Sequence, residues 1–109
     1  MKEDDGLSQK IRKLIINSNG HSPSLDQAAA CFHMSARTLH RHLKQEGTSY
    51  KEILESVTHQ LAKEYLRNTA LNIQEVSYLL GYSDQANFRR AFKRMGGMTP
   101  SEYRKANSD

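Results

Sequence analysis

The sequence is poor in cysteine and proline, lacks tryptophan and has no long apolar run. Its 109 residues include one cysteine, Cys31, and two prolines. A single cysteine cannot form a disulfide within one chain, and it is typical of a reducing, cytoplasmic setting. No apolar stretch approaches the roughly 18 residues that a membrane span needs. We therefore expect a cytoplasmic protein with no membrane partner.

The residue constellations of catalysis are also missing. The sequence has no glycine-rich phosphate loop, no nucleophile beside a base and no paired carboxylates. His40 and His42 stand two residues apart, so on a helix they point to different faces, whereas a zinc site needs convergent ligands. His33 and Cys31 are interpreted as a turn residue and a core residue. We therefore expect no enzyme, no metal site and no cofactor.

Sustained alternation of apolar and polar residues is absent too, which argues against β-strands. Apolar residues recur instead at helical spacing, often after a capping pattern such as Thr99-Pro100-Ser101-Glu102. The sequence predicts an all-α fold of seven helices. The predicted helices start at or near Leu7, Ser24, Ser35, Ser49, Asn72, Ser83 and Thr99; the first ends near Asn19-Gly20, the sixth at Gly96-Gly97 and the seventh around Tyr103.

Two parts of the chain repeat each other. Residues 25–35 match residues 73–83, and residues 43–52 match residues 92–102. Each copy combines a short helix, a turn and a longer basic helix, which is the pattern of a helix-turn-helix unit. The domain boundaries that we predict are 7–47 for the first helix-turn-helix subdomain, 48–69 for a long linker helix and 70–106 for the second subdomain.

Positive charge is concentrated in the longer helix of each unit. Residues 35–48 hold three basic residues against one acidic, and residues 84–95 hold four against one. In a helix-turn-helix, the second helix buries one side and presents the other to the DNA major groove. The predicted buried sides are Leu39 and Leu43 in the first unit, and Phe88, Ala91, Phe92 and Met95 in the second.

Three stretches of the second unit follow one another at fixed spacing: IQEVSYLLGYSD at 73–84, FRRAFKR at 88–94 and GMTPSEYR at 97–104. With them the chain resembles the DNA-binding domain of the AraC/XylS family of transcription regulators, and the resemblance extends back through Ser24. It implies seven helices, with two helix-turn-helix units joined by the fourth helix. It also implies a bacterial transcription regulator whose partner is double-stranded DNA.

The resemblance further implies which residues contact DNA. Arginine can bind guanine with two hydrogen bonds, and glutamine or asparagine can bind adenine in the same way. The base-reading candidates are Arg37, His40 and Arg41 in the first unit, and Gln85, Ala86, Asn87, Arg89 and Arg90 in the second. The phosphate-binding candidates are Lys44, Lys93 and Arg94.

Many members of this family carry a sensing or dimerisation domain N-terminal to the DNA-binding domain. We expect that domain to be absent from this chain and interpret residues 1–6, MKEDDG, as the remnant of a linker in a fragment. A small stand-alone regulator is the alternative. The isolated domain is expected to be a monomer, with RNA polymerase as a further partner.

Two other functions fit the basic helices. One is a helical module that docks on an acidic protein surface, for example on polymerase, and the other is a non-specific nucleic-acid binder. Competition by unrelated DNA separates specific from non-specific binding. The residues leave open the operator, the regulated genes, the inducer, and whether the output is activation or repression.

The length of the fourth helix predicts how both units use one DNA. From Ser49 to Asn68 it spans about 20 residues, hence roughly 30 Å. Successive major-groove faces lie about 34 Å apart. We therefore expect the two recognition helices to occupy adjacent major grooves of an asymmetric site.

Overall fold

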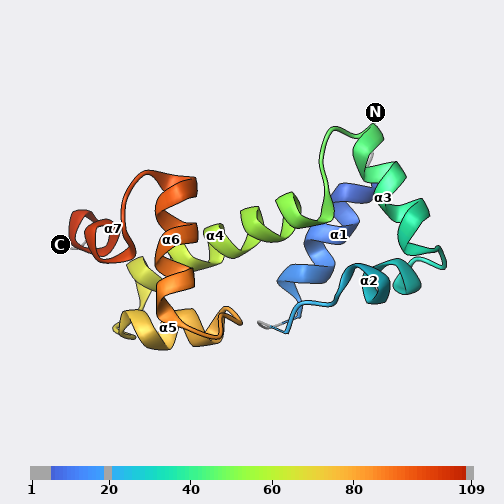
Figure 1. Cartoon of the computed structure of the whole chain (residues 1–109). Coiled ribbons are helices and arrows are strands. Elements are labelled where there is room, and N and C mark those ends of the chain that lie inside the picture. Colours follow the sequence, from blue (N-terminus) through green and yellow to red (C-terminus); the bar gives the residue numbers. More distant parts are fainter. Residues whose placement is uncertain (1–5, 19–20, 108–109) are drawn as a thin grey trace. The chain divides into compact units, whose positions relative to one another are not determined.

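The computed structural model describes residues 6–18 and 21–107 of the chain. Within these residues it contains helices and no strands, so the predicted all-α fold of seven helices is confirmed. The predicted linker remnant, apart from Gly6, and the first helix end predicted at Asn19-Gly20 lie outside the described residues. The helices are α1 (Leu7–Ile16), α2 (Leu25–Cys31), α3 (Ala36–Gln45), α4 (Tyr50–Asn68), α5 (Ile73–Leu79), α6 (Gln85–Gly96) and α7 (Pro100–Ala106) (Figure 1).

The chain divides into two compact units, of which the first ends at Val57 and the second begins at Thr58. The helices α1 to α3 and the start of α4 form the first unit, and the rest of α4 with α5 to α7 forms the second. The boundary falls inside α4, so this helix contributes to the core of both units. The division into 7–47, 48–69 and 70–106 stays a prediction.

Capping residues set where several helices begin. Asp84, rather than the predicted Ser83, caps α6, because its carboxylate accepts the backbone N–H of Asn87 at 2.8 Å. The last helix continues to Ala106 instead of ending around Tyr103. Such caps stabilise a helix by about 1 kcal/mol each. Complete capping boxes open three helices: Ser24 with Gln27 at α2, Asn72 with Glu75 at α5, and Thr99 with Glu102 at α7. The last of these confirms the capping pattern predicted at Thr99.

The core of the first unit is aliphatic apart from one tyrosine. The fully buried side chains of α3, Leu39 and Leu43, are one turn apart and therefore lie on the same side of the helix. Tyr50 at the start of α4 donates its hydroxyl to the carbonyl of Pro23, which holds the α1–α2 connection onto α4. The other core residues of this unit are Ile11, Ile15, Ala28, Ala29, Ile53 and Val57.

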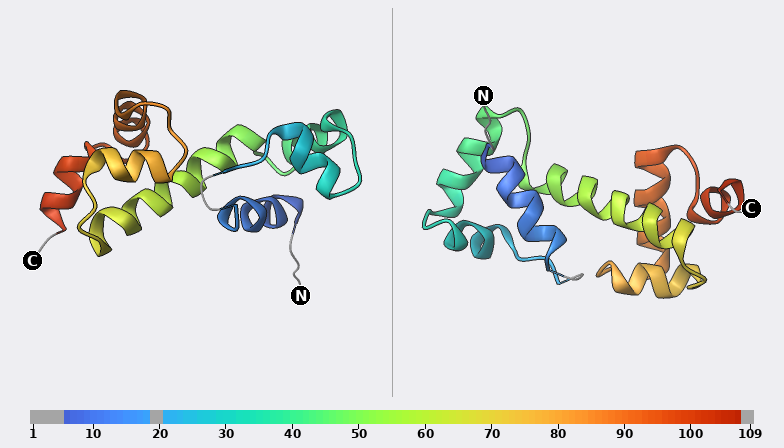
Figure 2. Two further views of the ribbon diagram at one scale, coloured as in Figure 1. Left: turned by 90° about the horizontal axis from the view of Figure 1, so that it is seen from below. Right: turned by 180° about the vertical axis from the view of Figure 1, so that it is seen from behind.

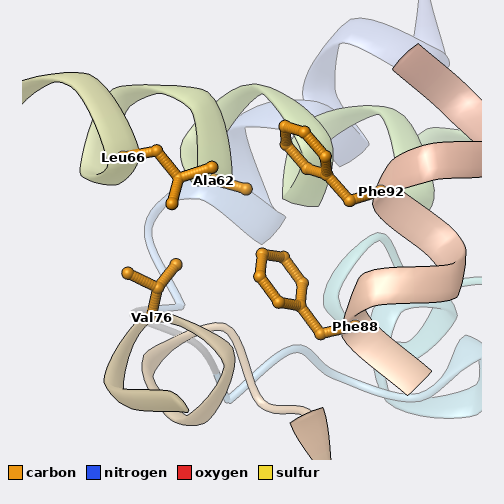
Figure 3. Close-up of a cluster of buried hydrophobic side chains, with 5 residues drawn as sticks. All are labelled: Ala62, Leu66, Val76, Phe88 and Phe92. Atoms are coloured by element: carbon orange, nitrogen blue, oxygen red, sulfur yellow. The ribbon is translucent and has the colours of Figure 1, made fainter. Parts of the chain in front are cut away.

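The core of the second unit is built around two phenylalanines of α6. Phe88 and Phe92 point towards Ala62 and Leu66 of α4 and towards Val76 of α5 (Figure 3). All five of these side chains are buried. The exposed fraction of Met95 is 40%, so its predicted place on the buried side is wrong. In the last turn of α6 it is Gly96, and not Met95, that lies against α4, where a Cβ added at Gly96 would approach His59 to 2.9 Å.

Aromatic contacts extend this core to both ends of α6. The ring of Phe88 lies 5.4 Å from that of Tyr82, and the ring of Phe92 lies 5.6 Å from that of Tyr103. Arg104 of α7 donates to the carbonyls of Leu66 at 3.0 Å and Thr69 at 3.3 Å. The last carbonyls of a helix lack partners within it, so Arg104 fastens α7 to the end of α4.

Candidate nucleic-acid interface

The turns that precede α3 and α6 have the same backbone geometry. His33 and Gly81 both take a positive φ, 59° and 89°. The N–H of Met34 donates to the carbonyl of Ala29, and the N–H of Tyr82 donates to that of Ser77, each five residues back. The sequence repeat is therefore also a structural one. Figure 2 shows the α2–α3 and α5–α6 pairs from two further sides.

In the first unit the predicted site residues lie on the exposed side of α3. Leu39 and Leu43 are fully buried and hold the opposite side of the helix against α2 and α1. Ser35 caps α3 by accepting the N–H of Thr38 at 3.1 Å. We call the exposed set the α3 basic face; it consists of Arg37, His40, Arg41 and Lys44.

In the second unit, α6 presents a similar but more strongly charged side. Gln85, at its start, is half-buried, whereas Ala86 and Asn87 are exposed. Ala86 offers only its methyl group, which suits a contact with a thymine methyl. We call the exposed cations of this helix the α6 basic face; it consists of Arg89, Arg90, Lys93 and Arg94.

A hydrogen-bonded chain orders the start of the α6 basic face. The Asn87 side-chain amide donates to Asp84 at 3.1 Å, and its oxygen accepts a bond from the Arg90 guanidinium. Asn87 therefore orients Arg90, and it must exchange these bonds before it can bind a base. Sequence reasoning missed Asp84 as a member of the site. The Asp-x-x-Asn spacing, which places both side chains at the first turn of a helix, is the signal that could have found it.

An open pocket of about 290 Å³ adjoins the α6 basic face. It is lined by Ala86, Arg89, Arg90, Lys93 and Thr99. Three cations around one cavity favour an anionic group, and a DNA phosphate has suitable charge and size. Thr99 was not predicted as a site residue, because its capping of α7 fully accounted for it in the sequence. Only folding brings the start of α7 beside α6.

The histidine, cysteine and acidic side chains of the described residues do not converge on a metal site. In the part of the chain that the structure describes, no group of three or more histidine, cysteine, aspartate or glutamate residues could hold a metal ion. His33 is a turn residue, as expected. Cys31 is exposed, so its interpretation as a core residue is wrong. It is the last residue of α2, two positions after the buried Ala29, and two positions along a helix bring a side chain to the opposite side. None of the described helices is long and apolar enough to cross a membrane.

Comparison with known proteins agrees with the repeated helix-turn-helix. The family described as "Helix-turn-helix domain" matches residues 28–106. Over 102 residues the chain is 44% identical to the ornithine utilization regulator of Pseudomonas aeruginosa. That match covers 94% of this chain and 30% of the relative, so the chain spans less than a third of the relative's length.

Two solved structures have the same arrangement of helices. A DNA-binding transcriptional dual regulator from Escherichia coli K-12 matches with a TM-score of 0.92 and 26% identity, over 98% of this chain and 96% of the other. A transcriptional regulator from Chromobacterium violaceum, described as of the AraC-type DNA-binding-domain proteins, matches with a TM-score of 0.77 and 26% identity. The second match covers 92% of this chain and 94% of the other.

Proposed function

The chain belongs to the AraC/XylS family of helix-turn-helix transcription regulators, a family of DNA-binding proteins and not of enzymes, and we propose that it binds double-stranded DNA sequence-specifically through α3 and α6. One observation carries this proposal. Two helices follow the same turn, each is buried on one side, and each exposes several basic side chains on the other. A helix held in this way can enter the major groove.

The side chains differ in the role that we propose for them. Arg37, Arg41 and Arg90 are assigned to bases, because a guanidinium can bind guanine with two hydrogen bonds. Lys44 and Lys93 are assigned to phosphates, because an ammonium is a point charge with little preference for one base. Thr99 lines the pocket beside α6 together with Lys93, and we assign this pocket to a DNA phosphate.

We further propose that one chain occupies two adjacent major grooves without dimerising. A helix of 19 residues, the length of α4, spans about 28 Å. That length is close to the roughly 34 Å between successive major-groove faces. Because the α3 and α6 basic faces carry different residues, the site is expected to be asymmetric, with half-elements about 10 base pairs apart.

Selection of bound sequences from a random duplex pool tests the proposed function. We expect enrichment of an asymmetric site that unrelated DNA does not displace at physiological salt. With about 6 phosphates neutralised, log affinity should fall against log salt with a slope of about −5. A slope near zero, or equal affinity for all duplexes, would contradict groove reading by these helices.

Two substitutions separate base reading from phosphate binding. Arg90→Ala should cost about 1–3 kcal/mol on the selected site and relax the preference at one or two base pairs. Lys93→Ala should weaken binding to all duplexes to a similar extent. Affinities measured for the selected site and its single-base variants distinguish the two. If Arg90→Ala weakens every sequence alike, Arg90 is a phosphate contact.

The finer partners of the chain are also proposals. We propose that it acts in the cytoplasm, as a monomeric DNA-binding module of an activator whose sensing domain is a separate part of the protein. We propose RNA polymerase as a second partner. The exposed fractions of Tyr78 and Leu79 of α5 are 71% and 46%, and these two large apolar side chains offer a surface for a protein contact. In a reporter assay, Tyr78→Ala should lower activation while DNA affinity stays unchanged.

A further inference from the structure

The first helix has a cap that comes from the far end of α3. The N-cap residue of α1, Gly6, has no side chain with which to accept the first N–H groups of the helix. The carboxylate of Glu46 takes them instead. The N–H of Leu7 donates to its Oε2 at 3.1 Å, and the N–H and hydroxyl of Ser8 donate to its Oε1 at 3.2 and 2.7 Å.

Two further features show that this contact is close and charged. A Cβ added at Gly6 would lie 2.7 Å from Glu46 Oε1, so the carboxylate occupies the space that a side chain there would need. The Ser8 hydroxyl, followed by the N–H groups of Ser8 and Leu7 and the charge of His42, lowers the pKa of Glu46 and outweighs its slight desolvation. The carboxylate is therefore ionised at neutral pH.

The place of Glu46 in the fold gives this contact its significance. It is the C-cap residue of α3, the helix that carries the first basic face, and it follows Lys44 by two positions. A carboxylate so near a DNA-binding surface repels phosphate, so electrostatics alone predicts that its removal strengthens binding. The hydrogen bonds of Glu46 act in the opposite direction. They tie the end of α3 to the first turn of α1, so their loss is expected to weaken DNA binding by α3.

We infer that Glu46 is a positioning residue, which touches no DNA but fixes how α3 is presented to its groove through the start of α1. The inference rests on the proposed function. Base contacts require side chains to be held in register with the base edges, so a small rotation of α3 weakens its hydrogen bonds to bases more than its phosphate contacts. Loss of the tie should therefore lower the selectivity of the first unit alone.

The experiment compares selectivity at the two half-elements of the selected site. For each half-element, a selectivity ratio is the Kd for a duplex with that half scrambled, divided by the Kd for the intact site. The variants are Glu46→Ala, the milder Ser8→Ala and the control Glu64→Ala. Glu64 is an exposed residue of α4 in the second unit, so the control removes the same charge without touching the tie.

We expect Glu46→Ala to reduce the ratio for the α3 half-element roughly fivefold, a change equivalent to part of one base contact. The ratio for the α6 half-element should stay unchanged. Ser8→Ala should cause a smaller loss at the same half-element, and Glu64→Ala should alter neither ratio. Circular dichroism melts show whether each variant is folded. If Glu46→Ala does not fold, Ser8→Ala alone provides the test.

Unchanged selectivity at the α3 half-element, in a variant whose Leu7 and Ser8 amides exchange faster than those of the wild type, would overturn the inference. Equal losses at both half-elements would also overturn it, because they mark a global effect on the fold. A wild-type protein that shows no selectivity at either half-element contradicts the proposed function, and the inference with it.

Discussion

Among single residues, His59 of α4 is a half-buried titratable group. Its ring lies 4.6 Å from that of Phe92, and its Nδ1 has no hydrogen-bond partner among the residues that the structure describes. A Cβ added at Gly96 would approach its Cε1 to 2.9 Å, so the imidazole also packs tightly against the end of α6. Burial, followed by the charge of Lys63, lowers the pKa of His59.

This lowered pKa predicts a pH dependence of stability. Because the unfolded chain binds the proton more readily than the folded one, the stability contribution of neutral His59 is complete above the ordinary histidine value of about 6.5. It is lost as pH falls through the lower pKa of the folded state. We expect the melting temperature of the second unit to fall between pH 7.5 and pH 5, and His59→Leu to reduce that fall. Melts of both proteins at the two pH values check this, and equal falls would show that other groups cause it.

Phe92 anchors the core of the second unit. Phe92 is buried, with an exposed fraction of 3%, and its ring contacts those of His59 and Tyr103. Phe92→Ala should therefore lower the free energy of unfolding by about 3–5 kcal/mol. Denaturant unfolding followed by circular dichroism measures the change. Met95→Ala is the matched control on the same helix, and a loss as large as that of Phe92→Ala would mean that burial is not the cause.

For the helices, the sequence predicts those features that depend on residues close together along the chain. The capping boxes follow from spacing alone, and so do the buried positions of α3 and α6 apart from Met95, which spacing places on the wrong side. Contacts between distant segments do not. The bond from Glu46 to Ser8 spans 38 positions, and Thr99 reaches the α6 pocket only after folding. Fully buried Ala62 was also missed, because an alanine carries little hydrophobic signal in a sequence.

The paired turns provide a prediction for this scale. Gly81 has a φ of 89°, which residues with a Cβ rarely adopt. Gly81→Ala should cost about 1–2 kcal/mol of stability in the second unit. His33→Gly is the matched change in the first unit. Glycine relieves the left-handed conformation, which stabilises the fold, but it also makes the unfolded chain more flexible, which destabilises the fold, so the two effects on stability oppose each other. Thermal melts compare the two, and a neutral Gly81→Ala would show that the turn tolerates a Cβ.

At the scale of the whole molecule, the spacing between half-elements is the measurable quantity. Inserting five base pairs turns one major groove to the far side of the duplex, since a full turn takes about 10 base pairs. We expect affinity to fall to the non-specific level and not to recover with ten inserted pairs, because a helix such as α4 cannot stretch. Gel shifts with the wild-type protein on these duplexes test this. Tight binding to the five-pair insertion would mean that the linker is flexible or that only one unit contacts DNA.

The two helix-turn-helix units share one turn geometry, yet α3 and α6 expose different side chains. A symmetric dimer that reads two identical half-sites binds equally well in either orientation, so its site has no beginning or end. A site read by two unlike helices has a defined direction along the DNA. Turning it around relative to a promoter would place the opposite unit nearest the start of transcription, while leaving affinity unchanged. A single chain bound to such a site therefore distinguishes the upstream from the downstream side of the promoter.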